Sequence, residues 1–159
     1  MKKSIALLSL LLVSACASNK DDNVVKPTNR SNQNQIEKQM ETKSNKNAIN
    51  DFNKYSSNNP IYFEFDSVNV INNDVMKKYT ELTKNLDDNA TLTFEGYCDD
   101  RGSDEYNDTL GQKRANAVKA KIGGKNSKVI SYGKRKFKKY SKDFEENQQA
   151  NRKVVVTAK

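Results

Sequence analysis

The sequence predicts an α/β sandwich, which is a β-sheet covered by helices on one face. Two patterns that alternate along the chain from residue 60 onward support this prediction. Short stretches alternate polar and apolar residues, which is typical of strands with one buried face. Longer stretches between them repeat apolar residues every three or four positions, which is typical of amphipathic helices. Strands that alternate with helices form a sheet with the helices packed against it.

Each expected element rests on one of these two patterns. The first strand is expected at 61–66, where Ile61, Phe63 and Phe65 alternate with polar residues. A helix is expected at 72–86, because its apolar residues recur at intervals of three and four. The same patterns predict the remaining elements, which are a strand at 91–96, a helix at 104–122, a strand at 128–132, a short helix at 143–150 and a strand at 154–157.

The helix expected at 104–122 carries two polar residues on its inward face. At about 100° per residue, Asn107 and Arg114 fall in the same half-circle as the apolar residues Tyr106, Leu110, Ala115, Ala117, Val118 and Ile122. An inward arginine is costly unless a carboxylate or an anionic ligand replaces its water. The loop before the helix supplies a carboxylate, Asp99.

Two interpretations of these residues are open. In the first, Asp99 and Arg114 form a structural ion pair that ties the loop to the helix. In the second, they line a small polar pocket in which Asp99 offers negative charge, Arg114 positive charge and Asn107 neutral hydrogen bonds. A pocket of this kind is suited to a zwitterionic ligand.

The stretch from residue 95 to residue 118 reads EGYCDDRGSDEYNDTLGQKRANAV. It closely resembles the signature of OmpA-like peptidoglycan-binding domains, although Tyr97 and Cys98 stand where that family usually has His-Thr. Three further motifs match in the same order, at 61–67 (IYFEFDS), 131–133 (SYG) and 151–154 (NRKV). The resemblance covers about residues 60 to 159.

The resemblance implies a βαβαβ(α)β domain with a four-stranded mixed sheet that binds peptidoglycan noncovalently. In this family the ligand is the diaminopimelate of stem peptides, whose free end carries an ammonium and a carboxylate. By the resemblance, Asp99 takes the ammonium, Arg114 takes the carboxylate, and Asn107 and Arg152 complete the pocket. The resemblance also implies TolB and other Tol proteins as partners in maintaining the envelope and drawing the outer membrane inward at cell division. An envelope lipoprotein of the same family outside that system is the alternative.

Residues 1–15 have the pattern of a lipoprotein signal peptide. A short basic region is followed at residues 5–13 by an apolar run that is too brief to span a bilayer as a lasting helix. Val13-Ser14-Ala15-Cys16 resembles a lipobox, in which Cys16 carries acyl chains such as palmitate after cleavage; a plain secretory signal is the alternative. Several acyl chains hold a protein on its membrane. Ala17 after the cysteine implies the outer membrane by the family's sorting pattern, with the domain facing the periplasm.

Residues 16–59, which follow the signal peptide, are expected to form a lipidated cysteine and a flexible tether. The segment from residue 17 to residue 59 contains 11 asparagines and only isolated apolar residues. Such a composition buries too little surface to offset the entropy of ordering. Ile36, Glu37 and Met40 allow a transient helical turn or two, with a partner-binding segment as the alternative. The folded domain is expected at 60–159.

The composition excludes several classes of site. The chain contains no histidine, which excludes catalysis by a serine or cysteine with a histidine base and argues against a metal site. With Cys16 lipidated, Cys98 has no partner for an intramolecular disulfide. The alternative of a cell-wall hydrolase is disfavoured because the chain has no histidine for a zinc site and because the adjacent positions of Asp99 and Asp100 are poorly suited to opposed acid and base roles. We expect no enzymatic activity and no cofactor.

Basic residues are dense in only one place. The chain has a formal net charge of +8, and residues 134–140 read KRKFKKY. We expect a solvated loop here, with contact to anionic glycan or a membrane surface as the alternative. A basic run with aromatic residues is also found in nucleic-acid-binding proteins, but an exported lipoprotein meets little nucleic acid.

Overall fold

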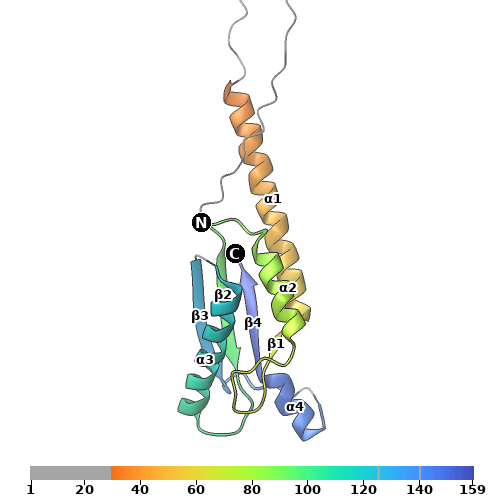
Figure 1. Ribbon diagram of the computed structural model, residues 1–159, viewed down its shortest axis with the longest axis vertical. Coiled ribbons are helices and arrows are strands. Elements are labelled where there is room, and N and C mark those ends of the chain that lie inside the picture. Colours follow the sequence, from red (N-terminus) through yellow and green to blue (C-terminus); the bar gives the residue numbers. More distant parts are fainter. Residues whose placement is uncertain (1–29, 125, 140) are drawn as a thin grey trace, which may run out of the picture.

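The computed structural model of the protein describes residues 30–124, 126–139 and 141–159. These residues form a four-stranded mixed sheet with helices packed against it (Figure 1). The elements are α1 (Arg30–Asn58), β1 (Ile61–Tyr62), α2 (Asn73–Thr83), β2 (Thr91–Tyr97), α3 (Asp104–Ile122), β3 (Asn126–Gly133), α4 (Phe144–Asn151) and β4 (Lys153–Ala158). The predicted α/β fold class is confirmed.

The sheet has the strand order β1-β4-β2-β3. β2 and β3 are parallel, whereas β4 runs antiparallel to both β1 and β2. One face of the sheet forms the core, where Leu92 and Phe94 of β2 lie beside Val154 and Val156 of β4. The helices cover this face with the buried residues Met76 and Tyr79 of α2 and Ala115, Val118 and Ile122 of α3.

A close approach between β2 and α3 sets the position of the helix. A Cβ atom added at Gly96 would lie 2.0 Å from the carbonyl oxygen of Gly111, so only glycine fits at the end of this strand. The first half of α3 therefore lies beside the loop that follows β2. Asn107 in this half and Arg114 just after it both hydrogen-bond to that loop or to the end of the strand.

The flexible tether predicted for 16–59 is wrong over residues 30–58, which form the helix α1. The second half of this helix belongs to the core. Phe52 is fully buried, and its ring centroid lies 5.5 Å from that of Tyr79. The folded domain therefore begins within α1 rather than at residue 60.

The position of α1 follows from the shortness of β1. Because β1 pairs only with the first two residues of β4, the rest of that edge of β4 lacks a strand partner. Polar side chains of α1 take this place. The side-chain amide of Asn53 donates to the carbonyl of Ala158 and accepts from its N–H, both at 2.8 Å, and the hydroxyl of Ser56 donates to the carbonyl of Val156.

Residues 63–70 form a hairpin rather than the second half of the strand expected at 61–66. Phe63 pairs with Val70 in an isolated bridge, and the N–H of Glu64 donates to the carbonyl of Asn69 at 3.1 Å. Asp66 lies at the turn with a φ of 49°. The alternating aromatic residues that suggested a longer strand therefore continue into a hairpin, and Phe65 is exposed at its tip.

The predicted signal peptide at 1–15 and the lipidation site Cys16 lie outside the described residues. Within the part of the chain that is described, no helix is both long enough and apolar enough to cross a membrane.

Candidate ligand-binding site

A small cavity lies at the lower end of the sheet in Figure 1, where β2 ends and β4 begins. Its volume is about 130 Å³, which is well below that of a site for a drug-sized molecule and suits the end of a smaller group. It is built from the 63–70 hairpin, the loop after β2 and the first half of α3. We call it the Arg114 pocket, and its lining residues are Phe65, Asp66, Asp99, Arg101, Gly102, Tyr106, Asn107, Leu110 and Arg114.

Arg114 is fully buried, as its place on α3 predicted. Its guanidinium donates to three backbone carbonyls, those of Ser67 at 2.9 Å, Glu64 at 3.0 Å and Tyr97 at 3.2 Å, and Nη1 also contacts the Cys98 sulfur at 3.5 Å. These bonds use four of the five N–H groups of an arginine. Every one of these acceptors is uncharged, and burial lowers the pKa of Arg114.

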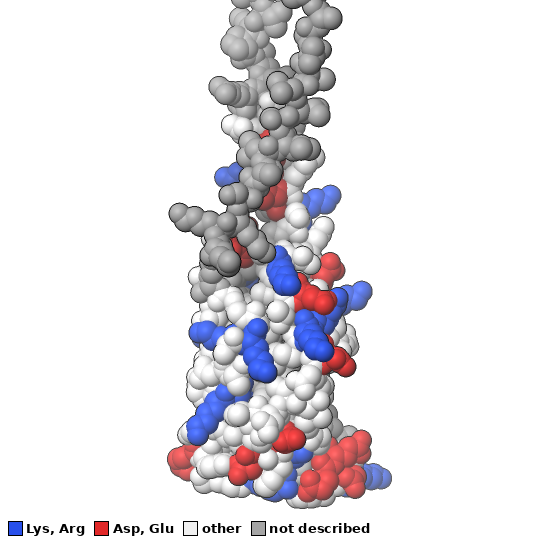
Figure 2. Space-filling view, viewed as in Figure 1, with Lys and Arg blue, Asp and Glu red and all other residues white. Residues whose placement is uncertain are grey.

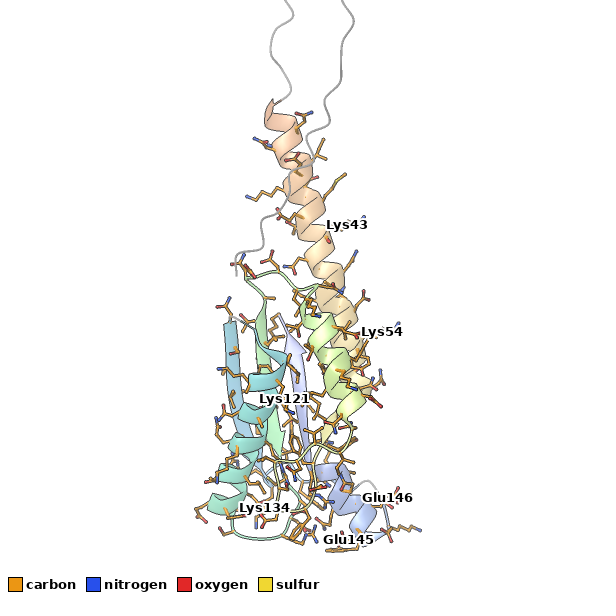
Figure 3. The ribbon with its side chains drawn as sticks, viewed as in Figure 1. Lys43, Lys54, Lys121, Lys134, Glu145 and Glu146 are labelled. Carbon is orange, nitrogen blue, oxygen red and sulfur yellow. The ribbon has the colours of Figure 1, made fainter. Side chains whose placement is uncertain are left out.

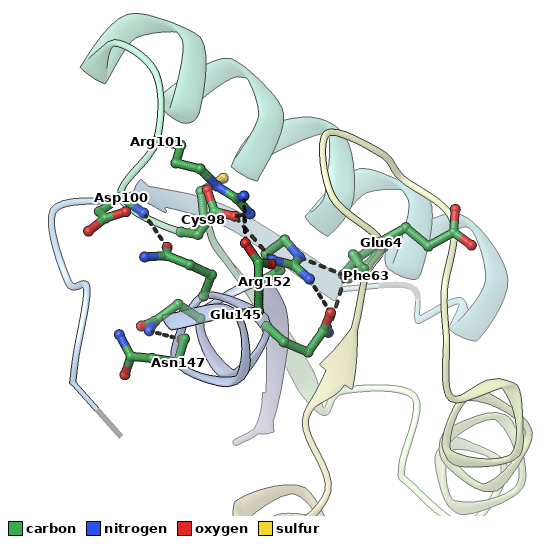
Figure 4. Close-up of polar contacts among 12 residues, drawn as sticks. Phe63, Glu64, Cys98, Asp100, Arg101, Glu145, Asn147 and Arg152 are labelled. Carbon is green, nitrogen blue, oxygen red and sulfur yellow. Dashed lines mark hydrogen bonds and ion pairs between the residues drawn. The ribbon is translucent and has the colours of Figure 1, made fainter. Parts of the chain in front are cut away.

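Asp99 is also buried, but it does not pair with Arg114. Its Oδ2 atom accepts from Arg101 Nη2 at 2.6 Å and from Arg152 Nη1 at 3.2 Å (Figure 4). Its other oxygen, Oδ1, accepts no hydrogen bond from the described residues. The first interpretation, a structural ion pair between Asp99 and Arg114, is therefore wrong. Both residues line the pocket, as the second interpretation requires.

Arg152, at the end of α4, holds Asp99 in place and does not line the pocket itself. Its Nε donates to the carbonyl of Phe63 at 3.2 Å, and its Nη2 donates to the side chain of Gln149. All three of its nitrogens thus have an acceptor. Arg152 therefore contacts a pocket-lining residue, Asp99, without lining the pocket itself.

Asn107 lines the pocket and also shapes it. Its amide nitrogen donates to the carbonyl of Arg101 at 2.6 Å and to that of Ser103 at 2.9 Å. The loop between β2 and α3 is thereby tied to the helix, which begins after Ser103 because the Ser103 hydroxyl accepts from the N–H of Tyr106 at 3.2 Å. Tyr106 itself, which was expected in the core, is exposed and donates to Asp66.

Sequence reasoning missed Arg101 and Phe65, which lie at the mouth of the pocket. The guanidinium carbon of Arg101 lies 4.0 Å from the ring centroid of Phe65 and 5.9 Å from that of Phe144. Its Nη1 pairs with Glu145 at 3.2 Å. The hydrogen bond with Asp99 raises the pKa of Arg101. Arg101 was missed because its position before Gly102 predicts a turn residue. Phe65 was missed because the alternating pattern of its segment predicts a strand rather than a hairpin.

The two unusual residues of the signature motif have different surroundings. Tyr97 gives its carbonyl to Arg114, while its hydroxyl donates to Glu95 at 2.7 Å and its ring lies 5.2 Å from that of Tyr132. Cys98 is buried, and its thiol donates to the carbonyl of Asn107 at 3.3 Å. Burial raises the pKa of the Cys98 thiol to about 11, so it is a neutral packing residue rather than a nucleophile.

The pocket lining carries both signs of charge, with the carboxylates of Asp66 and Asp99 and the guanidiniums of Arg101 and Arg114. In Figure 2 acidic side chains gather at the lower end of the molecule, and Figure 3 shows Glu145 and Glu146 of α4 there. Lys134 and Arg135 of the basic stretch also lie at this end, where they pair with Asp104 at 3.3 Å and with Asp108. These two residues therefore form ion pairs with carboxylates, whereas a fully solvated loop had been expected here. Among the described residues no group of three His, Cys, Asp or Glu side chains could hold a metal ion.

The amino-acid sequence is similar to those of several known proteins. Residues 62–152 match the sequence model of the OmpA family. The chain is 31% identical over 128 residues to the peptidoglycan-associated lipoprotein of Buchnera aphidicola subsp. Baizongia pistaciae, an alignment that covers 69% of this chain and 73% of that protein. It is 35% identical over 89 residues to the peptidoglycan-associated lipoprotein of Haemophilus influenzae, covering 49% of this chain and 55% of that protein.

Solved structures show the same fold. The crystal structure of the peptidoglycan-associated lipoprotein from Burkholderia pseudomallei is similar with a TM-score of 0.59 and 28% identity, covering 70% of this chain and 99% of that one. The C-terminal domain of Helicobacter pylori MotB is similar with a TM-score of 0.52 and 24% identity, covering 63% of this chain and 83% of that one. At 24% identity, the similarity to the MotB domain shows a shared fold and nothing further.

Proposed function

The chain belongs to the OmpA family, and from this premise we propose that it is a non-catalytic envelope protein that binds peptidoglycan noncovalently. The Arg114 pocket is the proposed binding site. Its ligand is the free end of diaminopimelate in a stem peptide, which carries an ammonium and a carboxylate side by side. Only this end enters the pocket, because a cavity of about 130 Å³ has no room for a glycan strand.

The observation that carries this proposal is the environment of Arg114. Arg114 is fully buried and its guanidinium donates only to uncharged groups, so its positive charge has no directly bonded anionic partner within the described part of the chain. A ligand carboxylate supplies that charge and can accept the N–H that Arg114 leaves unused on Nη2. Water is largely excluded at this depth, so the pairing is stronger than the same pair on the surface.

The other residues have distinct proposed roles. Asp99 receives the ligand ammonium on its carboxylate, and Arg152 keeps that carboxylate in position. Asn107 holds the loop that shapes the pocket and offers its amide oxygen to the ligand. The neutral Cys98 thiol lies behind Arg114 and takes no part in chemistry.

We extend the proposal to the setting of the protein. The Val13-Ser14-Ala15-Cys16 sequence and the relatives named as lipoproteins support acylation of Cys16 and a place in the outer membrane, with the domain in the periplasm. Partnership with TolB and other Tol proteins in the Tol-Pal system, and a role in drawing in the outer membrane at division, are proposed from the family resemblance of the signature motif. An envelope lipoprotein of this family outside that system is the alternative, and it shares the binding site.

Co-sedimentation with purified sacculi tests the binding site directly. Asp99→Asn keeps the shape of the side chain but removes its charge, so sacculus binding should fall about tenfold or more. Arg135→Ala is the matched control, since Arg135 is exposed and pairs with Asp108 rather than with a residue of the pocket. Free diaminopimelate should compete with sacculi for the wild-type protein. Unchanged binding by both Asp99→Asn and the Asp99→Ala Arg114→Ala double variant would refute the assignment.

A further inference from the structure

Arg101 is paired with the same carboxylate that the proposed ligand ammonium would contact. Its Nη2 atom lies 2.6 Å from Asp99 Oδ2, and its side chain forms part of the pocket lining. Asp99 is the only carboxylate among the pocket-lining residues that is buried. The structure therefore holds an internal cation on the group that the ligand needs.

The contact of Arg101 is less complete than that of Arg152, which shares the same oxygen. The side chain of Arg101 is 31% exposed, whereas that of Arg152 is 7% exposed. The Nε atom of Arg101 is buried and has no hydrogen-bond partner among the described residues. A buried donor without an acceptor is destabilising. Of the two guanidiniums on Asp99, Arg101 is thus the one that can leave at low cost.

A displaced Arg101 would keep other partners at the rim. Its Nη1 pairs with Glu145 at 3.2 Å, and its guanidinium carbon lies 4.0 Å from the ring centroid of Phe65. Phe65 and Phe144 are both exposed, so the flanking rings already face water. A small rotation toward Glu145 and Phe144 retains a carboxylate and an aromatic face for the guanidinium.

From these contacts we propose that Arg101 is an exchangeable cation that sets the specificity of the Arg114 pocket. A ligand opens the pocket by placing its own ammonium on Asp99 in exchange for Arg101. A carboxylate without a neighbouring ammonium leaves Arg101 on Asp99 and binds weakly. This inference rests on the proposed function and adds a selection rule to it.

The test compares two ligands on the purified protein by isothermal titration calorimetry. Diaminopimelate carries amines and carboxylates, while pimelate has the same chain and carboxylates without the amines. Arg101→Ala removes the internal competitor, so diaminopimelate should bind about three- to tenfold more tightly than to wild type. The affinity for pimelate should not change in Arg101→Ala. The control Arg135→Ala should bind both ligands with wild-type affinity. Arg101→Gln keeps most of the side-chain length without the charge and should act like Arg101→Ala.

The possible outcomes separate this inference from the proposed function. If wild type binds diaminopimelate but both Arg101 variants bind it equally or more weakly, Arg101 is an ordinary ligand contact and the exchange is refuted. If the Arg101 variants bound pimelate more tightly than wild type by the same factor as diaminopimelate, the proposed requirement for a ligand ammonium would be refuted. If neither wild type nor the variants bind diaminopimelate or sacculi, the proposed function fails and the exchange fails with it.

Discussion

The place of α1 in the folded domain can be tested through Phe52. This residue is fully buried against Tyr79 and lies in the same cluster as Ile61, Phe63 and Val156. Truncating a buried phenylalanine to alanine typically costs about 3–5 kcal/mol, because transfer energy is lost and a cavity remains. Phe52→Ala should therefore lower the free energy of unfolding by about that amount. A domain of ordinary stability has only about 5–15 kcal/mol in total, so this loss is a large fraction of the free energy of unfolding.

Urea unfolding followed by circular dichroism measures the effect. With a slope of roughly 2 kcal/mol per molar urea, a loss of about 4 kcal/mol moves the midpoint down by about 2 M. Met40→Ala is the matched control, since Met40 lies on the same helix but is 67% exposed, and it should change stability by at most about 0.5 kcal/mol. If Phe52→Ala were no more destabilising than Met40→Ala, α1 would not belong to the core and a flexible tether would be correct.

Three further predictions concern the site and its support. Gly96→Ala places a Cβ atom 2.0 Å from the carbonyl oxygen of Gly111, so it should lower the free energy of unfolding by about 3 kcal/mol in the same urea assay; a neutral effect would mean that α3 can move away from β2. Arg152→Gln should weaken diaminopimelate binding about tenfold by calorimetry although Arg152 does not line the pocket, because Asp99 loses its buried anchor; wild-type affinity would contradict this role. Since burial raises the pKa of the Cys98 thiol from 9.0 to about 11, the folded protein holds this proton more tightly than the unfolded chain, and stability should fall as the pH rises from about 9 to about 11. Cys98→Ser should lack that part of the decline, and at pH 8 mass spectrometry should find native Cys98 unmodified by a thiol reagent that modifies it in urea.

The sequence predicted the parts of the fold that have long and regular patterns. The bounds of α3 were predicted as observed, because its apolar residues keep one period over five turns. The inward position of Arg114 followed from that period alone. The 63–70 hairpin was missed because its aromatic residues alternate as they would in a strand, and only the turn at Asp66 interrupts them.

The second half of α1 could not be predicted for a different reason. Its contribution to the core comes mainly from Phe52, with Ile49 and Tyr55 partly buried beside it, in a segment otherwise rich in asparagine and lysine. Asn53 and Ser56 matter because they cover the edge of β4, and that edge is open only because β1 is so short. A long-range relation of this kind leaves no local pattern in the sequence.

The pocket was predicted in its centre and missed at its edge. Asp99, Asn107 and Arg114 could be brought together by helix geometry and the adjacent loop. Arg101 could not, because its position depends on Phe65 and Glu145, which come from two other segments of the chain. Arg152 lies behind the pocket rather than in it because α4 brings it against the carbonyl of Phe63.

The helix α1 also fixes a direction. Its 29 residues span about 44 Å as a rod, where the same residues fully extended would reach roughly twice as far. The rod leaves the domain at the end opposite to the Arg114 pocket (Figure 1). If the chain before Arg30 is held in the outer membrane as proposed, the opening that receives the stem peptide is presented away from the lipid and toward the cell wall. The rigid helix would then set a minimum distance between the bilayer and the cell wall, which a flexible chain would not do.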